Sequence, residues 1–107
     1  MTLDDVKRLP VFQTRGTATA AAEDDGQTNN YIFDCLMRLY AGDYGEIEQE
    51  DTDANNAELA DGEGRIVARY KQRHALTEDI YIIATFSQSM PDILDANNIT
   101  ILYCGEY

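Results

Sequence analysis

The sequence predicts an α+β domain of two layers, in which one main helix packs on a three- to four-stranded, mostly antiparallel sheet. Three observations support this class. Residues 31–41 carry apolar side chains with helical spacing, three segments after residue 64 have the composition of strands, and 107 residues suffice for one modest core. We therefore expect a single domain over residues 1–107 with the element order β-α-α-β-β-β.

The first strand is predicted at residues 9–13, a short apolar run after a charged start. Pro10 lies near its beginning, where a strand tolerates a missing N–H group. Residues 17–26 are rich in alanine and then acidic, so they fit either a short helix closed by Gly26 or a loop.

Residues 31–41 are the expected main helix and the centre of the core. Ile32, Leu36 and Leu39 repeat with the spacing that lines one helix face. Gly42 follows as a glycine that ends the helix in a left-handed conformation. The preceding residues offer candidates for the N-cap, namely Thr28, Asn29 and Asn30.

Three strands are expected in the C-terminal part of the chain. Residues 65–71 alternate, with an apolar face at Ile66, Ala68 and Tyr70. Residues 80–86 are β-branched and aromatic on both faces, which is typical of a central strand. Residues 90–98 are predicted to form a loop or helical turn, and residues 99–104 the last strand.

The negative charge is concentrated in one segment. Nine of the 20 acidic residues lie between residues 43 and 63, where there is no basic residue, against a net charge of -12 for the whole chain. A second, short helix is predicted inside this segment at residues 51–60, capped by Asp51 or Thr52. Such a field attracts basic surfaces. The expected partner-binding residues are the nine acids and one aromatic anchor, namely Asp43, Tyr44, Glu46, Glu48, Glu50, Asp51, Asp53, Glu58, Asp61 and Glu63.

The sequence gives little support to metal binding or catalysis. The segment from Asp51 to Asn55 resembles the opening of a calcium loop, which needs glycine at its sixth position and glutamate at its twelfth. Those positions are Asn56 and Gly62. The single histidine and the two cysteines match no zinc or nucleophile motif. We therefore predict no catalytic residues, no metal site, no cofactor and no enzyme activity.

Direct nucleic-acid binding and membrane insertion are also disfavoured. The acidic segment repels phosphate, and no apolar run approaches the roughly 18–20 residues that a membrane helix needs. The first residues lack the pattern of a signal peptide, so a cytoplasmic location is expected. The one basic cluster is interpreted as the solvent face of a strand that balances the acidic segment, and it comprises Arg65, Arg69, Lys71 and Arg73.

Short motifs are spread over most of the chain. They are the TRG at 14–16, the GDYGE at 42–46, Glu50-Asp51 with Asn55, Gly64-Arg65, the DIYII at 79–83, and the ITILY at 99–103 that closes on 105–107. Together they resemble a family of small proteins, often labelled "plasmid-related protein", from plasmids and integrative elements of gut Firmicutes and relatives. This chain differs in its insert at 19–25. The resemblance implies an accessory role in a mobile element and supplies no catalytic site.

Accessory proteins of mobile elements often block host defence, including as anti-CRISPR proteins. The sequence therefore predicts a non-enzymatic inhibitor, most concretely an anti-CRISPR protein. Its acidic surface would act as a DNA mimic and bind a basic nucleic-acid-binding protein such as a Cas nuclease. The alternative is an accessory regulator or partner-binding module of a plasmid or prophage, acting through an exposed sheet edge and without a role against defence. The sequence leaves the oligomeric state open.

Overall fold

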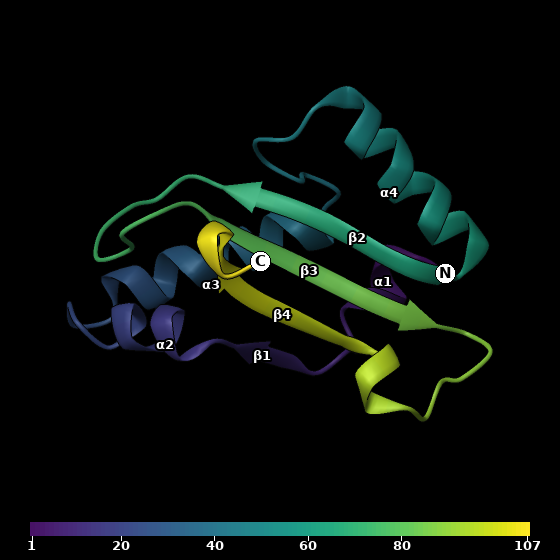
Figure 1. Ribbon diagram of the computed structural model, residues 1–107, viewed down its shortest axis with the longest axis horizontal. Coiled ribbons are helices and arrows are strands. Elements are labelled where there is room, and N and C mark those ends of the chain that lie inside the picture. Colours follow the sequence, from purple (N-terminus) through teal and green to yellow (C-terminus); the bar gives the residue numbers. More distant parts are fainter.

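The computed structural model describes all 107 residues, and its class is α+β, as predicted. Figure 1 shows how the elements follow one another along the chain. The helices are α1 (Leu3–Val6), α2 (Arg15–Ala21), α3 (Gln27–Tyr40) and α4 (Gln49–Asp61). The strands are β1 (Val11–Gln13), β2 (Glu63–Tyr70), β3 (Ile80–Ser87) and β4 (Asn98–Tyr103), and the 3₁₀ turns are η1 (Leu94–Ala96) and η2 (Cys104–Glu106).

The four strands form one sheet in the order β1-β4-β3-β2. β3 is antiparallel to both neighbours, with Ile82 opposite Ala68 of β2 and Ile101 of β4. β1 runs parallel to β4, so the sheet is mixed and mostly antiparallel. The apolar composition of β3 predicted a central strand correctly, and β1 and β2 are the two edges.

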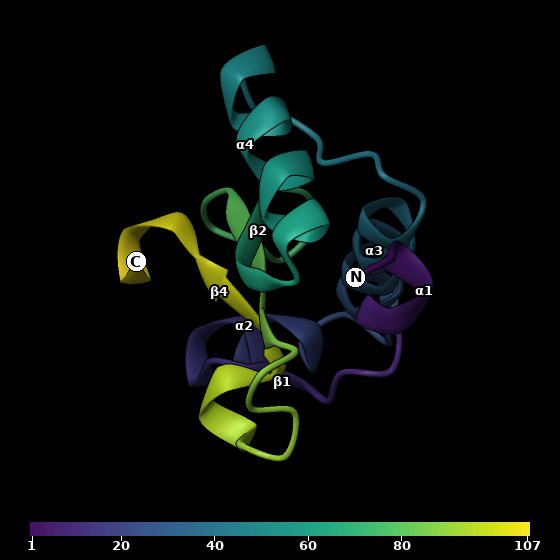
Figure 2. The same ribbon diagram turned by 90° about the vertical axis from the view of Figure 1, so that its right-hand side faces the viewer.

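The core lies between α3 and one face of the sheet, which we call the inner face (Figure 2). Ile32, Leu36 and Leu39 of α3 are buried, as the helical spacing predicted. The strands contribute the residues whose alternating pattern in the sequence predicted an apolar face. Of these, Ile66 and Ala68 have no exposed surface. The opposite, outer face of the sheet is turned away from α3.

α3 begins earlier than predicted because an acidic side chain caps it from the preceding turn. The helix starts at Gln27, and Gly26 is at the N-cap with a φ of 92°. Thr28 therefore lies inside the helix. The Asp24 carboxylate accepts hydrogen bonds from the Thr28 N–H at 2.9 Å and from its hydroxyl at 2.7 Å. The bond to the Thr28 N–H satisfies a backbone donor in the first turn of the helix. The sequence had predicted that a Thr or Asn side chain at the N-cap would satisfy such a donor.

Two short helices, α1 and α2, add to the predicted order. α1 is capped by a reciprocal pair of hydrogen bonds between Thr2 and Asp5. α2 occupies part of the segment that fitted either a helix or a loop. α4 begins before its predicted start, with Glu48 rather than Asp51 or Thr52 at the N-cap.

We expect Leu36→Ala to lower the free energy of unfolding by about 2–5 kcal/mol, because truncation leaves a cavity in the core. Leu36 is 8% exposed. The matched control is Met37→Ala on the same helix, because Met37 is 39% exposed, and we expect it to change stability by about 0.5 kcal/mol or less. Chemical denaturation measures both values. Equal losses for the two variants would show that the core face of α3 is assigned wrongly.

Candidate functional site

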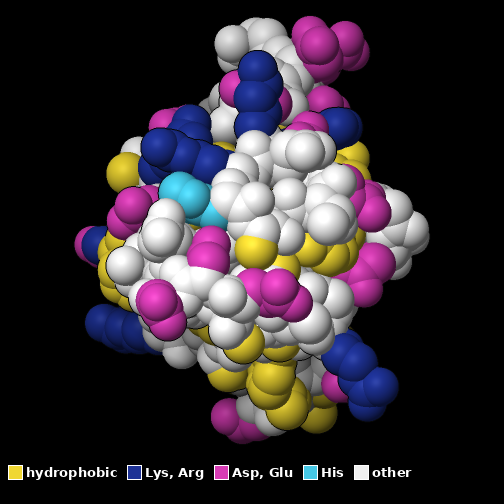
Figure 3. Space-filling model, turned by 90° about the vertical axis from the view of Figure 1, so that its left-hand side faces the viewer, with side chains coloured by type: hydrophobic (Ala, Val, Ile, Leu, Met, Phe, Trp, Pro, Cys, Tyr) yellow, Lys and Arg dark blue, Asp and Glu magenta, His cyan; other side chains and the backbone are white.

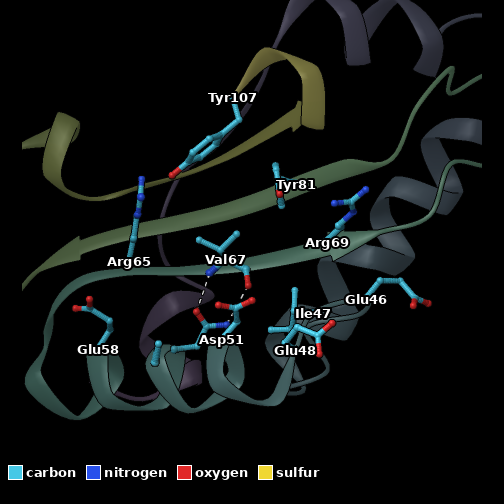
Figure 4. A pocket seen from close by; sticks show the side chains of 12 residues that line it. Glu46, Ile47, Glu48, Asp51, Glu58, Arg65, Val67, Arg69, Tyr81 and Tyr107 are labelled. Carbon is cyan, nitrogen blue, oxygen red and sulfur yellow. Dashed lines mark hydrogen bonds between the residues drawn. The ribbon is translucent and has the colours of Figure 1, made fainter.

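A groove of about 490 Å³ runs between α4 and the outer face of the sheet (Figure 4). One wall is α4 with the segment before it, and this wall carries the carboxylates of Glu46, Glu48, Asp51 and Glu58. The other wall belongs to β2, β3 and the C-terminal residue, and it carries Arg65, Arg69, Tyr81 and Tyr107. The groove therefore has an acidic wall that faces a basic and aromatic wall.

α4 is held against the free edge of β2 by one buried side chain, Asn55, which is 4% exposed. Its amide nitrogen donates to the Val67 carbonyl at 2.9 Å, and its amide oxygen accepts from the Val67 N–H at 3.0 Å (Figure 4). These two backbone groups of β2 point away from β3, so the side chain of Asn55 takes the place of a neighbouring strand. Leu59, one turn further along α4, adds the main apolar contact.

The segment Tyr44–Glu46 covers the same edge further along β2. The Arg69 N–H donates to the Tyr44 carbonyl at 3.0 Å, and the Glu46 N–H donates to the Arg69 carbonyl at 2.7 Å. Gly45 has a φ of 74°, and a Cβ there would lie 2.1 Å from the Arg69 carbonyl oxygen. Only glycine permits both this conformation and this close approach.

Asp43 ties this edge segment to the end of α3. Its carboxylate lies 2.7 Å from Nε of Arg38 and accepts a hydrogen bond from the Gly45 N–H at 3.0 Å. The Arg38 guanidinium holds the pKa of the Asp43 carboxyl below its ordinary value. The Tyr70 hydroxyl donates to the Asp43 carbonyl at 2.8 Å. Asp43 therefore shapes the turn before the acidic segment.

Three of the predicted partner-binding residues make structural contacts within the protein. Tyr44 is 4% exposed and belongs to the core cluster, so its prediction as an exposed aromatic anchor is wrong. The turn at residues 42–45 directs its ring inward. Asp43 is committed to Arg38, and Glu63 accepts a hydrogen bond from the Ser89 N–H at 2.8 Å, which fixes the loop after β3.

The remaining seven acids form what we call the acidic surface. None of them is paired with Lys or Arg, since the three ion pairs of the protein lie elsewhere. At about 100° per residue, the five acids within α4 fall in less than half of its circumference, on the side opposite Leu59, and Asp51 and Glu58 at one border of this arc line the groove beside Asn55. The members of the acidic surface are Glu46, Glu48, Glu50, Asp51, Asp53, Glu58 and Asp61.

The basic wall of the groove is held by contacts on its own side. Arg69 pairs with Asp79 at 3.0 Å and lies over the Tyr81 ring at 5.9 Å. Arg65 lies over the Tyr107 ring at 5.4 Å. No ion pair crosses the groove. Sequence reasoning missed both tyrosines, because Tyr81 is placed beside Arg69 only once the register of β2 and β3 is known.

The residues considered for metal or nucleophile chemistry do not assemble into a metal-binding group. No group of three or more His, Cys, Asp or Glu side chains has an arrangement that could hold a metal ion. The segment from Asp51 to Asn55 is continuous helix, where alternate side chains point about 200° apart rather than toward one ion. Cys35 is buried in the core, Cys104 lies in η2, and His74 is exposed in the β2–β3 loop. None of the helices combines the length and apolar content needed to cross a bilayer.

Comparisons of the chain with protein-family models, curated proteins and solved structures returned no match. The resemblance to plasmid-related proteins stays a prediction. The geometry of the site itself offers two features for binding, an exposed acidic helix and a groove whose walls carry opposite charge.

We expect Asn55→Ala to lower the free energy of unfolding by about 1–3 kcal/mol, because it leaves the Val67 N–H and carbonyl without their partner. Amide exchange at Val67 should also become faster in this variant. The matched control is Asn56→Ala, since Asn56 is exposed on the same helix. If the two variants unfold at the same denaturant concentration, Asn55 does not close the β2 edge.

Protonation of Asp79 at acidic pH should lower the free energy of unfolding. The Gln72 N–H donates to its carboxylate at 2.9 Å and Arg69 pairs with it, so its pKa lies below the ordinary value, with the backbone hydrogen bond as the main cause. A folded pKa lower than the unfolded one stabilises the protein above about pH 4, and this contribution is lost as the pH falls through the folded value. We expect the difference in unfolding free energy between wild type and Asp79→Asn to shrink from about pH 6 to about pH 3. A difference that is the same at both pH values would contradict this role.

Proposed function

We propose that this chain is a non-enzymatic binding protein whose acidic surface docks on a basic surface of a nucleic-acid-binding protein. In its most concrete form, the protein inhibits a host defence nuclease, as an anti-CRISPR protein that occupies the basic channel of a Cas nuclease. A Cas effector holds guide and target nucleic acid in such channels. The acidic surface would replace the phosphate charge there as a DNA mimic.

The main support is the seven carboxylates of the acidic surface, which have no ion-pair partner. Like charges one turn apart on a helix repel one another, so this arrangement lowers the stability of α4 outside its first turn. A basic partner relieves that repulsion. α4 also stands at the border of the sheet, away from the α3 layer (Figure 2), so its exposed side can enter a groove in another protein.

Apart from Arg65 and Arg69 in the groove, exposed positive charge lies away from the acidic surface. Lys71, Arg73 and His74 are exposed in the β2–β3 loop, and Figure 3 shows Lys and Arg side chains gathered beside the histidine. Arg65 and Arg69 lie on the outer face of β2, as the sequence interpretation had it, whereas Lys71 and Arg73 follow the strand, which corrects the interpretation for these two residues. Separated charges of this kind orient a protein as it approaches a charged partner.

The second candidate function is an accessory regulator of a mobile element that binds its partner through a sheet edge. It is favoured by the exposure of β1, where Val11 and Phe12 are 42% and 48% exposed. A partner bound there would be insensitive to changes in the acidic surface, which distinguishes the two functions.

Neutralising the acidic surface should abolish inhibition and leave the fold intact. The test variant combines Glu48→Gln, Glu50→Gln, Asp51→Asn and Asp53→Asn, which keeps side-chain size and avoids placing cations at the helix N-terminus. In a DNA-cleavage assay over a panel of Cas nucleases, we expect the concentration of protein needed for inhibition to rise about tenfold or more, or about 1.4 kcal/mol. Wild-type inhibition should also weaken with added salt, because the Debye length is only about 8 Å at physiological ionic strength.

The control variant changes net charge equally at four exposed acids outside this surface. It combines Glu23→Gln, Asp34→Asn, Asp92→Asn and Asp95→Asn. We expect this variant to inhibit like wild type. If both variants lose inhibition equally, net charge rather than the acidic surface governs binding. If the wild type inhibits no nuclease and captures no nucleic-acid-binding protein from host extract, the inhibitor proposal fails.

A further inference from the structure

The two edges of the sheet differ in how they are covered. The outer edge of β2 is closed by Asn55 and by the segment Tyr44–Glu46. β1 has no segment beyond it (Figure 1), and all three of its residues are exposed. Val11 and Phe12 expose apolar side chains on opposite faces of this strand. β1 has neither charge, bulge nor cover, and its shortness is its only protection against pairing with another strand.

The hydrogen bonds of β1 determine which of its backbone groups are free. The Ile99 N–H donates to the Pro10 carbonyl at 2.8 Å, and the Thr14 N–H donates to the Ile101 carbonyl at 3.0 Å. In a parallel ladder, residues alternate between bonding the neighbour and pointing away from it. Phe12 therefore points its N–H and carbonyl toward β4, and the residues on either side of it, Val11 and Gln13, present theirs to solvent.

We propose that a second copy of this chain pairs with β1 in antiparallel orientation, across a two-fold axis through Phe12. This register places Val11 of one copy opposite Gln13 of the other. Both are residues whose backbone groups point outward, so each of the two symmetric pairs exchanges two hydrogen bonds. Phe12 then lies opposite its own counterpart in a pair without hydrogen bonds, where side chains approach most closely.

The charge distribution favours a second copy in spite of the net charge of -12. β1 contains no charged residue. The acidic surface lies beyond β2, at the opposite end of the strand order, so pairing through β1 keeps the two acidic surfaces as far apart as the sheet allows. An unrelated strand could use the same backbone groups, but the self-paired register matches each exposed phenylalanine with another. This inference does not rest on the proposed function, because it leaves the acidic surface free.

The oligomeric state of the full chain tests the proposal. The short strand makes a small interface, so we expect a concentration-dependent rise in sedimentation mass from 12.0 kDa toward twice that value. Phe12→Lys should stay monomeric. Val11→Pro should also stay monomeric, because it removes an outward N–H without touching the bonds to β4. The matched control is Phe33→Lys, since Phe33 is 56% exposed on α3, and it should dimerise like wild type.

Amide exchange in the wild type gives a readout that no substitution can disturb. Exchange at Val11 and Gln13 should slow as protein concentration rises, while exchange at exposed amides of α4 should not. A wild type that stays monomeric up to about 1 mM would overturn the proposal. A Phe12→Lys variant that dimerises like wild type would overturn it too. An unrelated extended peptide that protects the same two amides, with a monomeric wild type, would show that β1 receives another partner instead.

Discussion

The acidic surface depends on closure of the outer edge of β2. α4 buries only Asn55 and Leu59, and an isolated helix of this length is marginal in water. Its position is therefore set by two hydrogen bonds from one amide side chain, by a single leucine, by the docked segment before it and by the Met1 amino group, which donates to the Leu59 carbonyl at 3.0 Å. If the Val67 backbone lost its partner, the acidic wall of the groove would lose its anchor as well.

The same closure explains why the turn after α3 has its composition. The chain must leave the inner layer and reach the sheet edge within a few residues. Asp43 turns it by pairing with Arg38, Tyr44 fills the core behind the turn, and Gly45 passes close to the β2 backbone. The residues of the acidic segment thus have different roles according to position. Those in the turn build the sheet edge, and those on α4 face solvent or the groove.

Periodicity predicted the parts of the fold that depend on a repeated pattern. The burial of Leu36 and Leu39 in α3, the inner face of β2 and the interior place of β3 follow from side-chain spacing, and α1 could have been found from its Thr2–Asp5 capping pair. The parallel pairing of β1 with β4 joins segments far apart in sequence, and no local pattern encodes it.

The groove was beyond sequence reasoning for the same reason. Its acidic wall was visible as composition, but its basic wall depends on the register of β2 with β3 and on the return of the C-terminal residue to Arg65. The burial of Tyr44 likewise depends on where the turn docks. The composition of the sequence showed where the negative charge is concentrated. Tertiary contacts determine which of these carboxylates have no intramolecular ion-pair partner.

Because one edge of the sheet is covered and the other is bare, the molecule has two surfaces that would interact with partners through different forces. The acidic surface beyond β2 acts over a distance and weakens as salt shortens the Debye length. The bare edge of β1 acts only on contact, through backbone hydrogen bonds and apolar side chains. If both are used, pairing through β1 places two acidic surfaces at opposite ends of one continuous sheet. Binding of the first to a basic partner would then raise the local concentration of the second, so avidity would strengthen an interaction that each helix alone makes weakly.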